Sequence, residues 1–226
     1  MTAKLPPGQR AIDHFPRFGV LAYAGRLPKM PGVPELQLAK DESSSSLRAE
    51  DFGELQRKEL VADFHCVTSW SRCGLRWSGY PFKDIYERLI VPRVRPEADD
   101  RFVELTALDG YRTSVLLADL LQENVVLADR LDGEPLSLEH GAPFRLVVPD
   151  LYAYKSVKHV SRIRLRKDFR RGLADRQTLA HPRGRVALEE RGRGLPGPIY
   201  RVVYRALIPA TLWYYRRFGT RAASRE

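Results

Sequence analysis

Cysteine is scarce in this 226-residue sequence, which contains two. Cys66 and Cys73 are too few and too closely spaced for the disulfide framework of a small secreted protein, so a reducing compartment is the simpler interpretation. No Cys-x-x-Cys or His-x-x-x-His spacing is present to bind zinc, and neither Cys-x-x-Cys-His nor His-Pro-Gly-Gly is present to bind haem. We therefore expect no disulfide scaffold, no zinc site and no haem.

Long hydrophobic runs are absent as well. The most apolar stretch, residues 206–215, contains Pro209 and is much shorter than the roughly 20 apolar residues of a membrane-spanning helix. The first nineteen residues contain neither the apolar core of a signal peptide nor a twin arginine. We therefore expect no transmembrane segment, no export signal and a cytoplasmic location.

Acidic residues are scarce only in the last third of the chain. Residues 1–160 carry 21 Lys and Arg against 23 Asp and Glu, whereas residues 161–226 carry 17 against 5. The whole formal charge of +10 therefore comes from the C-terminal part. A general nucleic-acid binder would carry its basic residues on the folded core, so this distribution argues against nucleic acid as a partner.

The length and the hydrophobic content of 43% are those of an ordinary globular protein. We expect one domain over residues 1–168, whose first 46 residues, rich in proline and glycine, form an arm that wraps the core. A basic, aromatic-rich extension follows over residues 169–226.

Two segments of the first half have recognisable periodicity. A short helix fits residues 47–60, and residues 61–70 fit a strand that leads into a loop around Cys66. Pro81 can then begin a helix, which Pro92 is expected to end. The apolar face of that helix would be formed by Phe82, Ile85, Tyr86, Leu89 and Ile90.

Strands dominate the rest of the chain up to residue 165. Residues 101–107 and 111–113 flank the turn pair Asp109-Gly110 and predict a hairpin. We expect a short helix near residue 118 and further strands over residues 125–128, 144–148 and 157–165. The sequence thus predicts a strand-rich, mixed α+β fold.

The surroundings of Cys66 give the strongest functional signal. The thiol lies in the stretch DFHCVTSWSR, residues 63–72, and LRWSGYP follows over residues 75–81. This pattern resembles the molybdenum-ligating cysteine segment of the sulfite oxidase superfamily of molybdopterin-dependent oxidoreductases. In that segment a cysteine is followed by a nearby Trp and then by Trp-x-Gly-hydrophobic-Pro. We read residues 70–81 as a polar loop followed by a turn.

A second stretch supports the resemblance independently. Residues 140–149 read HGAPFRLVVP, and residues 152–163 read YAYKSVKHVSRI. They are similar to the superfamily's Gly-x-Pro-hydrophobic-Arg strand and its Tyr-Gly-x-Lys-x-x-Lys segment, closest in character to the catalytic subunit of bacterial protein-methionine-sulfoxide reductases. Residues 13–19, DHFPRFG, resemble the N-terminal pterin-contacting motif of that family more weakly.

The resemblance implies a sulfite oxidase-like fold that binds a molybdenum-molybdopterin cofactor. Cys66 would be the metal ligand, and Tyr152 would position the substrate for a two-electron oxygen-atom transfer. The other residues implied to contact the cofactor are His14, Pro16, Arg17, Thr106, His140, Arg145, Ser156, Val157 and Lys158. An external electron-transfer partner would complete the cycle.

Elementary chemistry agrees with these roles. Molybdenum that changes oxidation state needs soft anionic donors, and a thiolate is one. Arginine offers a phosphate a two-pronged donor, whereas lysine offers a point charge, which suits Arg145 and Lys158. His65 and Arg72, close to Cys66 in sequence, are expected to favour its thiolate form.

Several positions depart from the family pattern. Ala153 replaces the usual glycine, and His140 and Asp13 stand where the sulfoxide reductases have asparagine. His159 stands after Lys158, where the family commonly has Trp or Ser. These changes leave cofactor binding in place but leave the substrate open. We expect a small sulfur- or nitrogen-containing molecule.

Alternative interpretations remain for several features. Trp70, Trp77 and Cys73 fit plain structural roles, and Lys155 is either a solvated loop charge or a contact to substrate or cofactor. The basic extension could wrap the core, dock on an electron-transfer partner or on a membrane, or bind nucleic acid, in that order of preference. For the whole protein, the alternative to an enzyme is a non-catalytic molybdopterin-binding or docking module.

Overall fold

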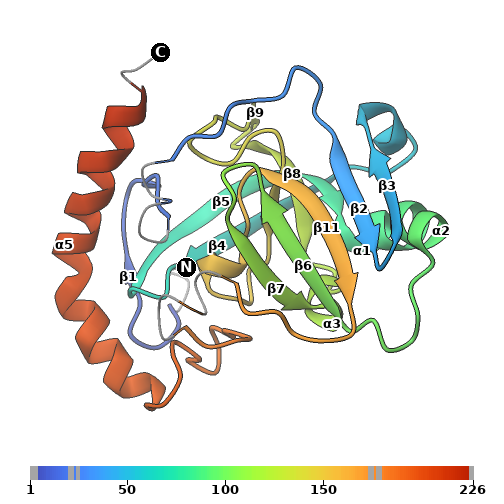
Figure 1. Ribbon diagram of the computed structural model, residues 1–226. Coiled ribbons are helices and arrows are strands. Elements are labelled where there is room, and N and C mark those ends of the chain that lie inside the picture. Colours follow the sequence, from blue (N-terminus) through green and yellow to red (C-terminus); the bar gives the residue numbers. More distant parts are fainter. Residues whose placement is uncertain (1–4, 20–22, 24–25, 173–175, 177–179, 224–226) are drawn as a thin grey trace.

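Two β-sheets and one long helix make up most of the structure (Figure 1). The computed structural model describes residues 5–19, 23, 26–172, 176 and 180–223, with side chains as far as residue 217. The sheets enclose the main hydrophobic core, to which both contribute alternate side chains. The strand-rich, mixed α+β class expected from the sequence is confirmed.

The six-stranded sheet is organised around β5 (Trp70–Pro81), which has 12 residues. β5 pairs antiparallel with β4 (Lys58–His65) and β8 (Val126–Leu131), and parallel with the short β1 (Arg10–Ala11). Two short strands extend the sheet from β8, namely β10 (Arg145–Val147) and β9 (Glu134–Pro135). This sheet carries Cys66 at the end of β4 and Arg145 at the start of β10.

The five-stranded sheet has the order β3-β2-β11-β6-β7. Its strands are β2 (Leu36–Lys40), β3 (Ser43–Leu47), β6 (Phe102–Ala107), β7 (Arg112–Leu116) and β11 (Val160–Arg166). The predicted hairpin is confirmed as β6 and β7, which pair from Phe102 opposite Leu116 to Thr106 opposite Arg112. β11 joins this hairpin to β2, with which it runs parallel.

The helix predicted after Pro81 is present and is longer than expected. It runs through α1 (Phe82–Asp84), a π-helical turn (Ile85–Ile90) and α2 (Val91–Val94), and it ends at Arg95, whose φ is 46°. Pro92 does not end it and lies just after the π-helical turn, at the second residue of α2. The predicted apolar face is buried apart from the half-buried Tyr86.

Two other local predictions were wrong. The helix expected over residues 47–60 is reduced to the 3₁₀ turn Ala49–Phe52, and the serine run before it forms β3, paired along its whole length with β2. Residues 70–81 form a strand rather than a polar loop and a turn. In both segments the side-chain pattern does not indicate a strand, and the strand forms because the backbone hydrogen-bonds to a neighbouring strand.

The last two helices differ greatly in length. α3 (Leu117–Leu120) is the short helix predicted near residue 118, whereas α5 (Gly197–Ala223) has 27 residues and was not predicted. α5 lies along one side of the core and leaves its far side uncovered (Figure 1). In the described part of the chain, no helix is both long and apolar enough to cross a membrane.

Candidate active site

A tight turn between β4 and β5 presents the Cys66 thiol. The Cys66 N–H donates to the Trp70 carbonyl at 2.9 Å, and the Ser69 N–H donates to the Cys66 carbonyl at 3.1 Å. The Cys66 Sγ lies 3.2 Å from the Thr68 hydroxyl. The N-terminal segment supports the same turn, because the Gln9 side-chain amide donates to the Cys66 carbonyl at 3.1 Å. The thiol is therefore held at a fixed place beneath the surface.

Arg191, from the C-terminal extension, supplies the positive charge that acts on this thiol. Burial raises the pKa of Cys66, and Arg191 opposes that rise. The expectation that His65 and Arg72 would do so was wrong. Burial lowers the pKa of His65, whose Nδ1 lies 2.8 Å from the Ser71 hydroxyl, and the Arg72 guanidinium donates to the Cys73 carbonyl at 2.8 Å.

The same Arg191 side chain ties three parts of the chain together. It is fully buried and donates to the Val67 carbonyl at 2.7 Å, to the Ser69 hydroxyl at 2.9 Å and to the Pro7 carbonyl at 3.0 Å. Its Nε lies 3.4 Å from a carboxylate oxygen of Glu189. The extension therefore fixes the loop that carries Cys66 instead of merely covering it.

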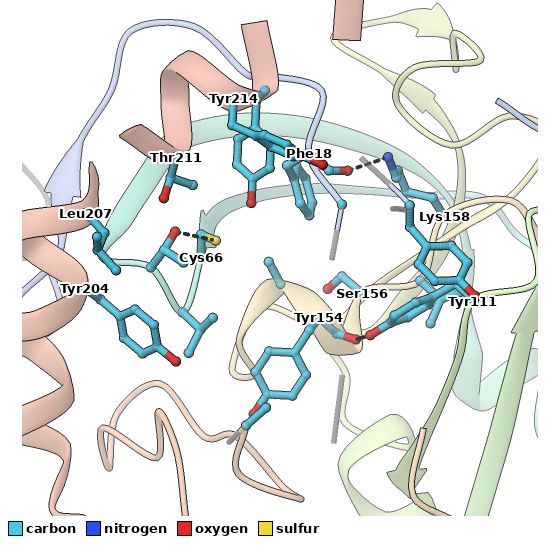
Figure 2. Close-up of a pocket in the computed structure, with 18 of the residues that line it drawn as sticks. Phe18, Cys66, Tyr111, Tyr154, Ser156, Lys158, Tyr204, Leu207, Thr211 and Tyr214 are labelled. Atoms are coloured by element: carbon cyan, nitrogen blue, oxygen red, sulfur yellow. Dashed lines mark hydrogen bonds between the residues drawn. The ribbon is translucent and has the colours of Figure 1, made fainter. Parts of the chain in front are cut away.

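A cavity of about 420 Å³ opens beside Cys66 (Figure 2). This volume is within the usual range for small-molecule and cofactor sites, about 300–1,000 Å³. Cys66 lies toward one end of the cavity and Lys158 toward the other, with the 3₁₀ helix Ala153–Lys155 and the residues after it between them. Ser156 and Val157, two of the residues implied to bind the cofactor, also line this wall.

One wall of the cavity comes from α5, which the sequence reasoning missed. Tyr204, Leu207, Thr211 and Tyr214 line the cavity at the end where Cys66 lies (Figure 2). None of the α5 side chains that line it carries a charge. The spacing of 204, 207, 211 and 214 is that of one helical face, so this periodicity in the extension was the signal that could have predicted the wall.

Two basic residues lie at this end of the site, the half-buried Lys158 and the fully buried Arg145. The Lys158 ammonium donates to the Phe18 carbonyl at 2.7 Å, and the fully buried Arg145 donates through Nη1 to the His140 carbonyl at 2.9 Å. The Nε and Nη2 of Arg145 are buried without an acceptor. Throughout the described residues, no carboxylate forms an ion pair with either Arg145 or Lys158.

The protonation equilibria of this group reflect burial and mutual repulsion. Burial lowers the pKa of Arg145 to about 9. Burial, together with Arg145 and Arg17, lowers the pKa of Lys158 to about 7. The pKa values of His140 and His159 both fall to about 4, with burial as the main cause, so both imidazoles are neutral at pH 7.

These residues fit a cofactor that carries an anionic group. Buried cations are normally paired, and buried N–H groups normally have acceptors. A phosphate near Lys158 and Arg145 would satisfy both needs, and a soft metal would find a thiol donor at Cys66. The donors thus match both ends of a molybdopterin cofactor, with the metal at Cys66 and the anionic group at the basic end.

The other residues implied to bind the cofactor lie at different distances from the cavity. Pro16 and Arg17 are buried in the N-terminal segment beside Phe18, and Arg17 donates to the Arg26 carbonyl at 2.6 Å. His14, in the same segment, is exposed. Thr106 belongs to β6 in the five-stranded sheet, where its carbonyl accepts a hydrogen bond from Ser161. None of these side chains lines the cavity.

Tyr152 is fully buried beside the site and does not line the cavity. The Arg191 guanidinium lies 5.4 Å from the centre of its ring, and burial raises the pKa of its phenol to about 12. Lys155 is also fully buried, and its ammonium donates to the Ser114 carbonyl at 2.8 Å, so it is not a solvated loop charge. The described residues contain no group of three His, Cys, Asp or Glu side chains that could hold a metal ion together.

Comparison with known proteins gives matches over most of the chain. Residues 35–173 match the family described as the oxidoreductase molybdopterin binding domain. The uncharacterized oxidoreductase YuiH of Bacillus subtilis is 34% identical over 186 residues, which cover 81% of this chain and 89% of YuiH. The protein-methionine-sulfoxide reductase catalytic subunit MsrP of Xanthomonas campestris is 28% identical over 125 residues, 49% of this chain and 37% of MsrP.

Among solved structures, the sulfane dehydrogenase SoxCD of Paracoccus pantotrophus has a similar fold. Its TM-score is 0.54 at 19% identity, and the match covers 67% of this chain and 44% of that one. The family match ends at residue 173, before Arg191 and α5. The helix that forms one wall of the cavity therefore lies outside the family's common part.

Proposed function

Because this chain belongs to the molybdopterin-binding oxidoreductase family, within the sulfite oxidase family, we propose that it catalyses a two-electron oxygen-atom transfer at the Cys66 end of the cavity. We propose as substrate a small, uncharged sulfoxide or N-oxide. The observation that supports this proposal is the cavity that joins the fixed Cys66 thiol to the Lys158 ammonium, which has no carboxylate partner among the described residues and lies near the buried Arg145.

Each part of the cavity has a role in this proposal. When bound, the molybdenum-molybdopterin cofactor supplies the two-electron redox chemistry. Cys66 would hold its metal, while Lys158 and Arg145 would hold its anionic group and Ser156 and Val157 would line its flank. The Ser156 hydroxyl accepts a hydrogen bond from the Val148 N–H at 3.1 Å, which fixes this flank to the strand region around β10.

The α5 wall favours an uncharged substrate over sulfite. A site for an anion such as sulfite needs cations that face the reacting centre. Around Cys66 the cavity instead presents the uncharged side chains of Tyr204, Leu207, Thr211 and Tyr214 (Figure 2). Hydroxyl groups among them can donate hydrogen bonds to the oxygen of a sulfoxide or N-oxide while excluding water.

The electron carrier is external to this chain in the proposal. MsrP is named as a catalytic subunit, and YedZ1 of Azospira oryzae, 32% identical over 106 residues, is named as a putative subunit of such a reductase. The chain spans little more than a third of either relative. A separate electron-transfer partner is therefore proposed by analogy with them, as a class and not as a particular protein.

Metal analysis of matched cysteine variants tests the proposal. Cys66→Ser should lose most of its molybdenum when the protein is made in a cofactor-competent host, because a hydroxyl is a harder and more weakly binding donor. Cys73→Ser is the control, since Cys73 is only partly buried and lies outside the cavity. Full molybdenum content in Cys66→Ser would contradict the ligand assignment.

The wild-type preparation then tests the substrate with a dye as electron donor or acceptor. We expect reduction of small sulfoxides or N-oxides to be faster than oxidation of sulfite. Faster oxidation of sulfite would overturn the substrate proposal. A protein that carries molybdenum but turns over none of these compounds would favour the alternative, a cofactor-binding module without catalysis.

A further inference from the structure

The two faces of α5 have different neighbours but similar polarity. Tyr200, Ile208 and Tyr215 are buried against the core. A surface helix of a globular protein normally carries polar residues on the opposite, solvent-facing side. α5 departs from this rule, because the outer side of the helix carries apolar side chains over about four turns.

The outer side forms one continuous stripe, which we call the α5 outer stripe. Val202 is 70% exposed, Val203 is 51% exposed and Trp213 is 62% exposed. The spacing of these residues places them on one face of the helix, directly opposite the side chains that pack on the core. The stripe consists of Ile199, Val202, Val203, Ala206 and Trp213.

The charges beside the stripe all have one sign. Residues 191–225 contain no Asp or Glu. Arg205 and Arg216 lie along one edge of the stripe, and Arg217 lies at its C-terminal end, all three exposed. An apolar face bordered only by arginines complements a surface that combines an apolar interior with negative charge.

We propose that the α5 outer stripe docks this protein on an anionic membrane surface, with the helix lying in the plane of the interface. Apolar side chains would enter the boundary between headgroups and acyl chains, and the arginines would meet anionic headgroups. α5 does not have the hydrophobicity of a spanning helix, which fits a helix that lies on the membrane. This inference goes beyond the proposed oxygen-atom transfer and does not depend on it.

Charge favours a membrane over a second copy of this chain. A symmetric dimer through the stripe would place the same surface on both sides of the interface. Arg205, Arg216 and Arg217 of one copy would then approach the same arginines of the other, with no acidic residue of α5 to pair with them. An anionic lipid surface brings the opposite charge.

Trp213 is a built-in probe for the test. The other two tryptophans, Trp70 and Trp77, are 0% and 1% exposed, so a change in the fluorescence maximum on adding vesicles reports on α5. The full-length protein is mixed with phosphatidylcholine vesicles that contain or lack phosphatidylglycerol. We expect a blue shift and co-sedimentation with the anionic vesicles only, and weaker binding at high salt.

Matched variants locate the surface. Val202→Asp combined with Val203→Asp should weaken vesicle binding at least about tenfold, because each carboxylate opposes both burial and the lipid charge. The control is Val61→Asp on β4, whose side chain is 67% exposed and lies away from α5, and which should bind as the wild type does. Unchanged far-UV circular dichroism shows that the double variant is folded.

Several results would overturn the proposal. They are the absence of vesicle binding, equal binding to neutral and anionic vesicles, and equal loss of binding in Val61→Asp and the double variant. Self-association that Val202→Asp abolishes, without vesicle binding, would instead identify a second copy as the occupant. None of these measurements depends on enzymatic activity, so their outcome is independent of the test of the proposed function.

Discussion

Single buried cations in this protein fall into two kinds. Lys40 is buried with acidic partners, since its ammonium lies 2.6 Å from Glu97 and 3.6 Å from Asp100. Arg145 and Lys158, in contrast, have only carbonyl acceptors among the described residues. Lys155 is likewise held by uncharged oxygens, but Arg145 differs in that its Nε and Nη2 are buried without an acceptor, which a group from outside the chain could supply.

The pH dependence of stability should reveal Lys158. The folded apoprotein releases the Lys158 proton as the pH rises through about 7, whereas the unfolded chain keeps it up to about 10.5. The unfolded state therefore binds more protons in this interval, and the free energy of unfolding increases with pH. Between pH 7 and pH 9 we expect a gain of about 1–2 kcal/mol in urea denaturation of the apoprotein.

A pair of lysine variants separates this effect from general titration. Lys158→Met should flatten the rise in stability, whereas Lys29→Met, at an exposed position, should keep it. Arg145 and Arg17 lower the pKa of Lys158, whereas Asp109 and Glu139 raise it. Because the pKa of Arg145 is about 9, its own proton loss begins toward the upper end of this range, and the slopes are compared close to pH 7, where Lys158 titrates. An equal slope in wild type and Lys158→Met would rule out the assignment.

At the residue scale, the sequence predicted those site residues that lie within a recognisable motif. Cys66 and Lys158 were predicted as site residues from their motifs, and both line the cavity. Arg191 was not predicted, because its main partners are backbone carbonyls. Any residue has such a carbonyl, so the contact leaves no signature in the sequence of residues 67–69.

Strand β5 is the element on which the six-stranded sheet depends, and Gly79 is its most constrained position. A Cβ at this position would lie 2.2 Å from the Leu127 carbonyl oxygen and 2.5 Å from the Ala128 Cα, both on β8. The register shifts between Ser78 and Gly79, where the two strands approach most closely. Glycine at this point is required by the distance between two backbones rather than by its own φ.

Adding one methyl group tests this close approach. Gly79→Ala should lower the free energy of unfolding by about 3 kcal/mol or more, since backbone on both sides must shift. Gly32→Ala is the control, because nothing lies within 4 Å of its added Cβ; it should change stability by less than about 1 kcal/mol. Thermal and urea denaturation of both variants would decide, and similar stabilities would contradict the close packing of β5 on β8.

At the element scale, the sequence predicted those elements whose own residues carry the signal, such as a turn motif within a hairpin. The β6–β7 hairpin contains its own turn, Asp109-Gly110, where the Tyr111 N–H donates to the Asp109 carboxylate at 2.9 Å. β3 has no such signal, because its run of serines shows no alternation of apolar and polar residues. Only its pairing with β2 makes it a strand. α5, in contrast, did have a local signal, because its tyrosines are spaced as on one face of a helix, but that spacing was not interpreted as a helix.

The whole molecule brings three distant segments to one cavity. The Cys66 loop, the residues around Lys158 and the α5 wall come from positions near 66, 153–158 and 204–215 of the chain. The sequence predicted the strand-rich fold and the first two segments, because family motifs mark them. The third segment was predicted only as a basic extension, since nothing local states which surface a helix will cover.

Arg191 tests whether the extension stabilises the whole structure. Arg191→Met removes donors to Val67, Ser69 and Pro7 and leaves their oxygens buried, so we expect a loss of about 3 kcal/mol in the free energy of unfolding. Hydrogen exchange at the amides of residues 66–69 should become faster, because the loop loses its support.

Arg76→Met provides the comparison. The Arg76 side chain is 65% exposed and its carboxylate partner Glu59 is 4.0 Å away, so its loss should cost less than about 0.5 kcal/mol. Normal exchange at residues 66–69 in Arg191→Met would mean that the Cys66 turn stands without the extension.

The contact between Arg191 and Pro7 spans 184 residues, and that between Arg191 and Val67 spans 124. During translation, the Cys66 loop and the N-terminal segment leave the ribosome long before Arg191 and α5 are made. The nascent chain can build its sheets in that interval, but it cannot close the pocket. Cofactor loading is therefore expected to follow synthesis of Arg191 and α5, which makes this step a late event in biogenesis and one that a maturation factor would have to accommodate.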